Sequence, residues 1–555
     1  MKRPKLKALK TKDLMLRSLI ISFVIYGVYY AVNAAHIKYP DNYLIVGMAS
    51  FVLFTMLFLP QLMGVKKERF EPDINFIFML AHMLSVATSK TSNVNVVGSV
   101  SRSDLYGKYS KLFRKVYLLV KEYGYDFPRA MLIVSKAAEK IKYLKDFMER
   151  YAAAVRVGED IERFMEVELR NSMNTYEYIY SRIMDSTRVL LGVYTAVMTS
   201  VIFVISNLLV LSIIFGGNYS LIYMSFIGSF FSLVAVLATL KLGLPKDFLV
   251  IEGPVRKKVI QLPYIAMLIG VAAALWIFIM YVFYIININV FLLIAIMGGM
   301  LLGSGYLFRK IEGFVRHVDE DFPVFIRMYG SNLSIVPSPL KAIEPLTSVV
   351  FGYIASAIRR LHTLLSNNIS FSVAIKEFAR TSASELIRRS SEIVSDTLKY
   401  GGNTVKVGLI LSDLSQMVNR IRRRRLQVHK TFETSVYALH TTNILLITFI
   451  TSLMTIFAKA LSSIQTMIPF YAMPQSVITM LSVSTAISLT IINSVALTLT
   501  NGGLKHTLIY YMGLLLLLGG ISAYMSGILV DYIMKPLSSI MTQTLQPVYP
   551  ANTTT

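Results

Sequence analysis

The residues with the clearest capacity for chemistry form one run, "NRIRRRRLQVHK", from Asn419 to Lys430. Guanidinium groups at this density bind nucleic acid, phosphate or carboxylate, or gather at the inner surface of a membrane. No aromatic stacking platform or recognised nucleic-acid-binding fold accompanies the run, so we expect no nucleic acid as a partner. An apolar segment begins soon afterwards, at Val436. This predicts that the arginines face lipid headgroups and water on the cytoplasmic side of a membrane helix.

The remaining titratable residues form no pattern typical of catalysis or metal binding. The sequence has no G-x-x-x-x-G-K-[ST] phosphate loop, and its 7 histidines include no H-E-x-x-H motif. It has no cysteine, which excludes disulfides, thiolate nucleophiles and cysteine-ligated metals. Acidic residues between Glu159 and Glu168 are typical of a solvated helix start, with a docking surface for a basic partner as the alternative. We therefore expect no enzymatic activity, no metal and no cofactor.

The composition indicates what kind of elements carry these residues. Of the 555 residues 54% are hydrophobic, and yet the net charge is +24. Apolar and basic residues must therefore occupy separate segments. This is typical of a polytopic membrane protein with basic domains on one side.

Nine apolar runs are long enough to cross a membrane as helices. They are Leu14–Ile37, Leu44–Gly64, Val189–Phe215, Leu221–Leu242, Leu262–Ile286, Val290–Phe308, Val436–Phe457, Val477–Thr500 and Leu508–Val530. The first follows a basic N-terminal stretch but is longer than the apolar core of a signal peptide, so we expect an uncleaved anchor.

The distribution of Lys and Arg predicts the orientation of these spans. With the N-terminus inside, the only Lys or Arg residues in the outward segments are Lys38, Lys459 and Lys535. We predict a multi-pass protein of the cell membrane, with the N-terminus and two large domains in the cytoplasm and the C-terminus outside. Asn218 and Asn552 then lie outside in glycosylation motifs, and the sequence leaves their modification open.

The spans divide the chain into five regions. These are a membrane anchor (1–64), a first cytoplasmic domain (65–188), a four-span membrane domain (189–308), a second cytoplasmic domain (309–434) and a three-span membrane domain with a short outward tail (435–555). Apolar residues at spacings of three and four predict that both cytoplasmic domains are helical bundles. The expected fold class is all-α, with about nine transmembrane helices and two duplicated cytoplasmic bundles.

The last helix of each cytoplasmic domain is predicted to continue into the membrane. No Gly or Pro occurs between Leu409 and Met454, and a helix of that length spans roughly 65–70 Å. Such a helix would be a stiff lever between the second bundle and the seventh span. We expect Arg422, Arg423 and Arg424 to point mostly away from its apolar stripe.

The two cytoplasmic domains resemble each other in the order of their parts. Each has a basic pair, then a Phe-x-x-Ala sequence, then a glycine before the long final helix. The pairs are Arg114 with Lys115 and Arg359 with Arg360; the later features are Phe127 and Phe371, and Gly158 and Gly402. Because the same spacing of 244 residues separates both later features, we interpret the domains as a duplication.

This order of parts resembles the type II secretion F-domain family of inner-membrane platform proteins. The segments "FPRAMLIVSKAA" and "FSVAIKEFARTS" are similar to the helix entry of that family, and the resemblance covers Glu71–Leu240 and Asp319–Thr500. The nine spans, basic domains and absence of cysteine are most similar to the archaeal members, which serve the archaellum or archaeal pili.

The resemblance implies a platform, commonly a homodimer, beneath a filament of pilin-like or archaellin-like subunits. It also implies that a cytoplasmic hexameric secretion ATPase docks on the two bundles. We expect basic residues of both bundles to form the docking face. The candidates are Arg114, Lys115, Arg359, Arg360, Arg422, Arg423, Arg424 and Arg425. Which filament the protein serves, an archaellum or an adhesive pilus, stays open.

The membrane spans carry packing signals rather than transport signals. Gly299 and Gly303 form a G-x-x-x-G pair suited to close helix contact. The eighth span has a hydroxyl residue every few positions, which favours internal packing over a dimer interface or a groove for filament subunits. The alternative function is a transporter or channel with cytoplasmic regulatory domains, but no ionisable residue is expected at mid-membrane.

Overall fold

The computed structural model describes residues 72–215, 219–251, 260–462 and 475–544, and these residues are almost entirely helical. Within them, 7 helices are long and apolar enough to cross a membrane. The last seven predicted spans each fall on one of these helices, which confirms the expected all-α polytopic class. The predicted spans Leu14–Ile37 and Leu44–Gly64, and the motifs at Asn218 and Asn552, lie outside the described residues.

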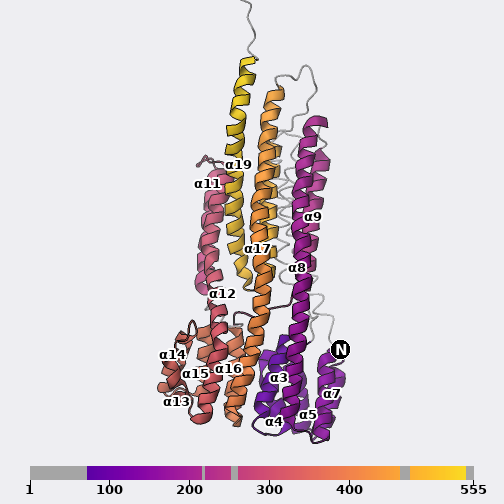
Figure 1. Ribbon diagram of the computed structural model, residues 1–555, viewed down its shortest axis with the longest axis vertical. Coiled ribbons are helices and arrows are strands. Elements are labelled where there is room, and N and C mark those ends of the chain that lie inside the picture. The colour runs from indigo at the N-terminus through magenta and orange to yellow at the C-terminus, as the bar shows by residue number, and fades with distance from the viewer. Residues whose placement is uncertain (1–71, 216–218, 252–259, 463–474, 545–555) are drawn as a thin grey trace, which may run out of the picture.

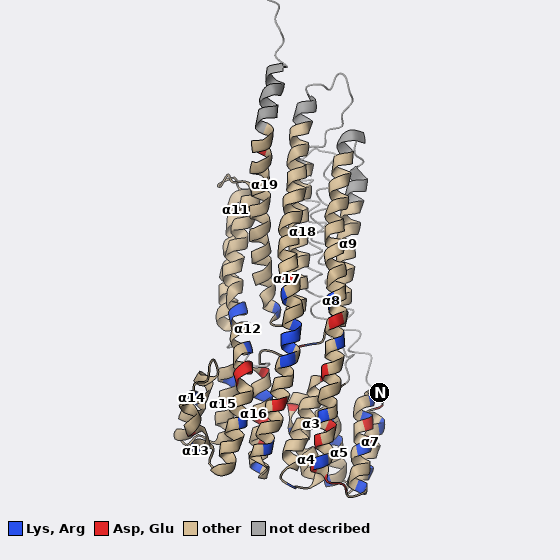
Figure 2. Ribbon diagram, viewed as in Figure 1, with Lys and Arg blue, Asp and Glu red and all other residues tan. Residues whose placement is uncertain are grey.

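The membrane-length helices run side by side along the long axis, and two helical bundles lie at one end of them (Figure 1). These helices are α8 (Ile161–Phe215), α9 (Tyr219–Gly243), α11 (Gln261–Val282), α12 (Val290–Ile335), α17 (Thr404–Ser462), α18 (Gln475–Asn501) and α19 (Leu508–Thr544). Charged residues concentrate on the bundles and on the adjoining helix ends, whereas the spans are almost uncharged (Figure 2).

The first bundle precedes α8 in the chain. It consists of α3 (Ile74–Ala87), α4 (Asn93–Arg102), η1 (Asp104–Tyr106), α5 (Lys108–Lys121), α6 (Phe127–Ala137) and α7 (Lys142–Arg156). Local sequence sets the helix limits. The side chain of Asp73 caps α3 by accepting from the Phe76 N–H at 2.9 Å, and Gly158, with φ +74°, follows the end of α7.

The second bundle lies around the end of α12. It adds α13 (Pro339–Ile343), η2 (Glu344–Thr347), α14 (Ala355–Ser366), α15 (Phe371–Ser382) and α16 (Glu385–Tyr400). Ser384 caps α16 by accepting from the Ile387 N–H at 3.2 Å. The second bundle is thus joined to the membrane helices by two unbroken helices, α12 and α17, of which only α17 was expected.

Long continuous helices connect the bundles to the membrane part, as the sequence predicts. The helix α8 has 55 residues and α17 has 59, so they extend over about 80 and 90 Å. Neither contains a proline, and Gly192 is the single glycine of α8. Each long helix therefore joins its bundle to the membrane part as one continuous element.

The repeat predicted from the sequence reappears in the helix starts, with one correction. The helices α6 and α15 begin at Phe127 and Phe371, as expected. The glycine with a left-handed backbone before the second long helix is Gly401, at φ +71°, and not Gly402. A Cβ on Gly402 would instead lie 2.9 Å from Thr88 Oγ1, so this residue is a close contact between the two bundles.

The glycine pair predicted to pack helices is not the pair that does so. A Cβ on Gly303 would meet nothing within 4 Å, and one on Gly299 would meet only Leu517 Cδ1 at 4.0 Å. The glycines of α12 that make the close contact are Gly298, one residue before Gly299, and Gly305, two residues after Gly303. They lie on another face of the helix, because each residue turns the helix by about 100°.

The close contact is between α12 and α19, which pack antiparallel. A Cβ on Gly305 would lie 2.4 Å from Tyr510 N, and one on Gly513 would lie 2.3 Å from Leu302 N. Only glycine allows these backbones to approach so closely. The glycines on this contact are Gly298, Gly305, Gly513 and Gly520.

The hydroxyl residues of the eighth span point into the protein. The helix α18 is the most buried of the described membrane helices. Thr485, Ser494 and Thr498 are buried and donate to carbonyls one turn earlier in the same helix. This agrees with internal packing rather than with an open groove.

Candidate functional site

A cluster of buried and half-buried charged and polar residues lies where the bundles meet the membrane helices, and we call it the polar junction. It combines residues of α12, α17, the adjoining ends of α18 and α19, and the loop 244–251 after α9. Its members are Asp247, Arg309, Glu312, Arg316, Asp319, Arg422, Arg425, His429, Glu433, Tyr437, Asn501 and Tyr511.

Arg422 forms the part of the junction nearest the bundles. Its guanidinium donates to Asp319 Oδ2 at 2.6 Å, to Asp247 Oδ1 at 3.2 Å and to the Phe248 carbonyl at 2.7 Å. Asp319 also accepts from Ser384 Oγ. Because Arg422 is only 7% exposed, one side chain of α17 fixes α12, the loop after α9 and the start of α16 together.

Arg425, three residues further on the same face of α17, binds backbone rather than acids. It donates to the carbonyls of Leu499 at 2.7 Å and of Thr500 and Pro245 at 2.9 Å. The first two belong to the C-terminal turn of α18, whose carbonyls have no partner inside the helix. Arg425 therefore caps α18 and ties it to α17 and to the loop after α9.

Glu312 on α12 organises the turn from α18 to α19. Its carboxylate accepts from Asn501 Nδ2 at 2.8 Å, from Thr507 Oγ1 at 2.6 Å and from the Leu504 N–H. A Cβ on Gly503 would lie 2.2 Å from Oε1, so glycine is required for the turn to close around this carboxylate.

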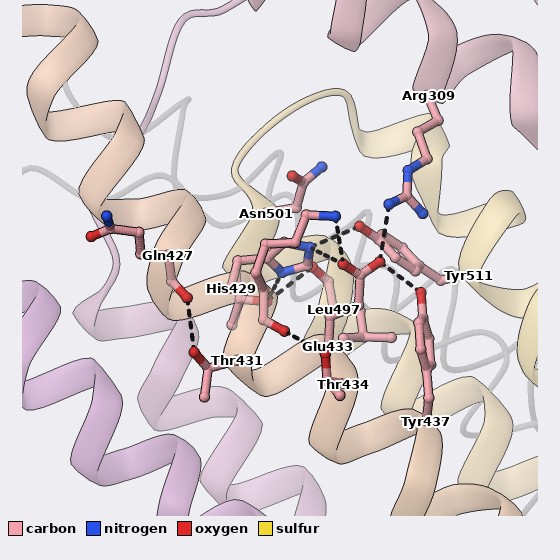
Figure 3. Close-up of polar contacts among 12 residues, drawn as sticks. Arg309, Gln427, His429, Thr431, Glu433, Thr434, Tyr437, Leu497, Asn501 and Tyr511 are labelled. Atoms are coloured by element: carbon pink, nitrogen blue, oxygen red, sulfur yellow. Dashed lines mark hydrogen bonds and ion pairs between the residues drawn. The ribbon is translucent and has the colours of Figure 1, made fainter.

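Glu433 on α17 collects donors from two helices, as Figure 3 shows. Tyr437 OH donates to Oε1 at 2.7 Å, and Arg309 Nη2 of α12 lies 3.3 Å from the same oxygen. Lys430 Nζ lies 3.3 Å from Oε2. The carboxylate is thus neutralised between α12 and its own helix.

His429 joins the same region to α18 and α19. Its Nδ1 lies 2.9 Å from Thr500 Oγ1, and its Nε2 lies 3.0 Å from Tyr511 OH. Both ring nitrogens have a hydroxyl partner inside the protein, and Figure 3 shows the ring of His429 close to Tyr511.

Burial and neighbouring cations act in opposite directions on the carboxyls of the junction, and burial prevails at Asp319, whose pKa is raised to about 6 despite Arg422. Burial would raise the pKa of the Asp247 carboxyl, but Arg422, Arg425 and Arg316 outweigh it and hold that pKa below its usual value. Burial would likewise raise the pKa of Glu385 beside the junction, and Arg388 and Arg389 outweigh it. The junction is therefore a set of compensated charges at neutral pH.

The arrangement is suited to holding elements together rather than to a reaction. Its polar atoms bind one another, and the described residues contain no group of three His, Cys, Asp or Glu that could hold a metal. The cavity beside Asp247 and Arg422 has a volume of about 30 Å³, roughly the space of one water molecule in the liquid. It is too small for a nucleotide or a transported solute.

The structure separates the predicted docking residues into two groups. Arg114 and Lys115 on α5 and Arg359 and Arg360 on α14 are exposed, one pair on each bundle. Among the four consecutive arginines Arg422 to Arg425, the middle two are exposed and paired with surface acids, Arg423 with Glu320 at 3.1 Å and Arg424 with Asp185 at 3.0 Å.

The expectation that Arg422 points away from the interior is wrong. Arg422 and Arg425 are buried because partners from elsewhere in the chain meet them, and the sequence of α17 does not show these partners. The junction residues that sequence reasoning missed are Asp247, Glu312, Asp319 and Glu433. Their signal was the presence of acids within a turn or a few turns of the predicted span ends.

The fold and the junction define a polytopic α-helical membrane protein whose membrane helices continue into two bundles. Among proteins of known name, the chain is similar to flagella accessory protein J of Methanocaldococcus jannaschii, with 22% identity over 384 residues, or 67% of this chain and 68% of the relative. It is also 22% identical over 386 residues to flagella accessory protein J of Methanococcus voltae, with the same shares covered.

No protein-family model and no solved structure matches the chain. The resemblance to the type II secretion F-domain family therefore stays a prediction. The similarity to the two flagella accessory proteins covers about two thirds of the chain.

Proposed function

We propose that this protein is a non-enzymatic membrane platform for the assembly of an archaellum or a related archaeal filament. The observation that carries the proposal is the passage of α8, α12 and α17 from the bundles into the membrane part without a break, fixed by the polar junction. A continuous connection of this kind can transmit a force or a rotation from the bundles to the membrane helices. The similarity to flagella accessory protein J supports the archaellum as the filament.

In this proposal both bundles lie in the cytoplasm and a hexameric secretion ATPase docks on them. The docking face comprises the exposed basic residues Arg114, Lys115, Arg359, Arg360, Arg423 and Arg424. Arg422 and Arg425 are left out, since their donors are already used within the chain. Archaellin-like subunits and a second copy of the chain would bind within the membrane.

The regions 1–64, 65–188, 189–308, 309–434 and 435–555 remain our proposed division of the chain. The N-terminus and both bundles would be inside and the C-terminus outside. In a transporter or channel, a solute path should cross the membrane helices. The cavity at the junction is too small for a solute.

The proposal is tested by purification of the tagged protein in mild detergent from cells of an archaeon that makes archaella. We expect a hexameric secretion ATPase to co-purify. Reversal of one exposed basic pair, Arg359→Glu with Arg360→Glu, should reduce its recovery at least tenfold. Reversal of Arg380, an exposed residue of the same bundle that pairs with Glu377 at 2.7 Å, serves as the matched control and should leave recovery unchanged.

Two results would contradict the proposal. One is normal filaments in cells from which the gene has been deleted. The other is solute flux into proteoliposomes that contain the purified protein, together with no ATPase recovered.

A further inference from the structure

The helix α3 is buried on two sides, and the two sides differ in chemistry. Toward its own bundle it is aromatic: Phe76 lies 5.2 Å from the Tyr143 ring and 5.6 Å from the Phe147 ring, between ring centroids. Toward the second bundle it presents residues at steps of three and four. These are Asn75, Phe78, His82, Ser85 and Thr88, of which only Phe78 is apolar.

Three of the four polar residues of that stripe have a partner in the second bundle, whereas Ser85 donates to the Ala81 carbonyl of its own helix. Arg389 Nη1 donates to Asn75 Oδ1 at 2.6 Å, and His82 Nε2 lies 3.1 Å from Asp396 Oδ2. The Asn403 N–H donates to Thr88 Oγ1 at 3.0 Å. We call this surface, together with the facing parts of α8 and α17, the interbundle seam. Its polar groups can exchange their partners for water, so separating them costs less than separating an apolar contact. The apolar contacts of the seam include Ile74 and Phe78 of α3 with Leu386 and Val418.

The same seam continues between α8 and α17 as a ladder of opposite charges. The acids lie on α8 and the bases on α17. The pairs are Glu162 and Glu166 with Lys406, Glu177 with Arg420, and Asp185 with Arg424, at 2.7–3.0 Å. Their side chains are between 22% and 58% exposed. Exposed pairs of this kind each change an equilibrium by roughly fivefold or less.

The end of the seam nearest the membrane is constructed differently. The guanidinium of Arg389 lies between the rings of Phe78 and Phe248, at 5.3 and 5.1 Å from their centroids, and it is 4% exposed. The loop after α9 is bonded to the second bundle by its backbone, from Ile251 N to the Ala383 carbonyl at 2.9 Å. Arg422 of the polar junction lies in the same place. Breaking buried charge contacts costs far more than breaking exposed ones.

Above the junction, a buried polar node holds four membrane helices together. Tyr194 of α8 donates to Asn493 Oδ1 of α18 at 2.6 Å, and Asn493 Nδ2 lies 3.1 Å from His440 Nδ1 of α17. His440 Nε2 lies 3.1 Å from the Leu515 carbonyl of α19. The Nδ1 of His440 accepts in this arrangement, so Nε2 donates. The helix α8 is thereby attached to α17 within the membrane as well as below it.

We propose that the two bundles separate and reclose along the interbundle seam, from the end farthest from the membrane, while the polar junction and the node stay closed. The seam is then the joint at which a bound partner moves the lower part of α8 relative to α17. This role rests on the proposed function, whereas the opening itself does not.

The opening is tested with spin labels in the full-length protein in lipid nanodiscs. The chain has no cysteine, so the spin labels attach only to the cysteines that are introduced, and no native cysteine has to be replaced first. The labelled pair across the seam is Lys121→Cys with Asn367→Cys, and the control pair within the first bundle is Lys121→Cys with Glu139→Cys; all three sites are exposed. We expect two distance populations across the seam and one narrow population within the bundle.

A charge reversal should shift the populations in a defined direction. Arg420→Glu places two acids opposite each other at Glu177, and we expect the ratio of open to closed molecules to rise about two- to fivefold. The swap of both residues, Glu177→Arg with Arg420→Glu, should restore the wild-type ratio. Arg380→Glu, which breaks an ion pair within the second bundle, is the matched control and should leave it unchanged.

A cross-seam distance as narrow as the control, both in the wild type and in Arg420→Glu, overturns the inference. A parallel assay counts filaments on cells that lack the gene and carry each variant. Failure of the wild-type gene to restore filaments there would overturn the proposed function, and the spin-label distances would still decide whether the seam opens.

Discussion

Four consecutive arginines, Arg422 to Arg425, have two different environments in this protein. The first and last are three positions apart and share the inner face of α17, where Arg422 meets acids and Arg425 meets carbonyls. The middle two lie on the opposite face and pair with surface acids. An arginine of this run is thus either a buried structural contact or a surface charge, depending on the face of the helix from which it projects.

Removal of the buried arginine should be far more costly than removal of its neighbour. Arg422→Ala leaves Asp247 and Asp319 buried without their cation, and we expect a loss of about 3–5 kcal/mol in the free energy of unfolding. Arg423→Ala breaks an exposed pair and should cost about 1 kcal/mol or less. Denaturant titration of both variants in detergent measures the difference, and equal losses would contradict this account of the junction.

The pH dependence of stability should include a contribution from Asp247. Its pKa is lowered in the folded protein, so its stabilising contribution is present above the unfolded pKa of about 4 and is lost as the pH falls through the folded value. We expect the wild type to melt at a higher temperature than Asp247→Asn at pH 7, and the gap to shrink between about pH 5 and pH 3. Asp413→Asn, at an exposed site, should show no such gap.

At the scale of elements, the membrane part is organised by the backbone contact between α12 and α19. Two glycines on each helix repeat every seventh residue and meet in antiparallel register. Because α12 also enters the second bundle, this contact connects that bundle rigidly to α19. The ends of the same helices carry the polar junction, so glycine packing and buried charges act on one pair of helices.

A methyl group placed on this contact should disrupt it. The Cβ of Gly513→Ala would lie 2.3 Å from a backbone nitrogen that has no room to move, and we expect a loss of about 1–3 kcal/mol or more in the free energy of unfolding. Gly303→Ala meets no atom within 4 Å and should change stability little. Unfolding of both variants in the same detergent tests this, and a harmless Gly513→Ala would show that the helices are not in backbone contact.

At the scale of the whole molecule, charge is segregated along the long axis (Figure 2). The bundles and the adjoining helix ends hold most of the charged residues, and the far ends of the helices hold few, such as Asp531 of α19. In the orientation that we propose, the bundles lie inside because Lys and Arg are enriched on the inner side.

This orientation can be measured with single cysteines in the cysteine-free chain. Asn287→Cys lies in the exposed turn between α11 and α12, and Ser356→Cys lies on the exposed surface of α14. A membrane-impermeant maleimide applied to intact cells should label the first and not the second. After the cells are broken both should react. Labelling of Ser356→Cys on intact cells would reverse the proposed topology.

The sequence by itself determined the properties that depend only on the order of residues along the chain. Apolar length fixed the seven described spans, the absence of Gly and Pro predicted the continuous α17, and the shared spacing of Phe127 and Phe371 predicted matching helix starts. Each follows from local physics, since burial in lipid requires a minimum apolar length and a helix continues where nothing interrupts its hydrogen bonds.

Only the tertiary structure decided which faces meet. It placed the helix contact at Gly305 and Gly513 instead of Gly299 and Gly303, buried Arg422 against Asp247 and Asp319, and gave α3 its polar stripe toward the second bundle. The physical reason is that a buried charge or a backbone contact requires a partner remote in the chain. The angular position of that partner is set by the packing of whole helices and is not recorded in the local sequence.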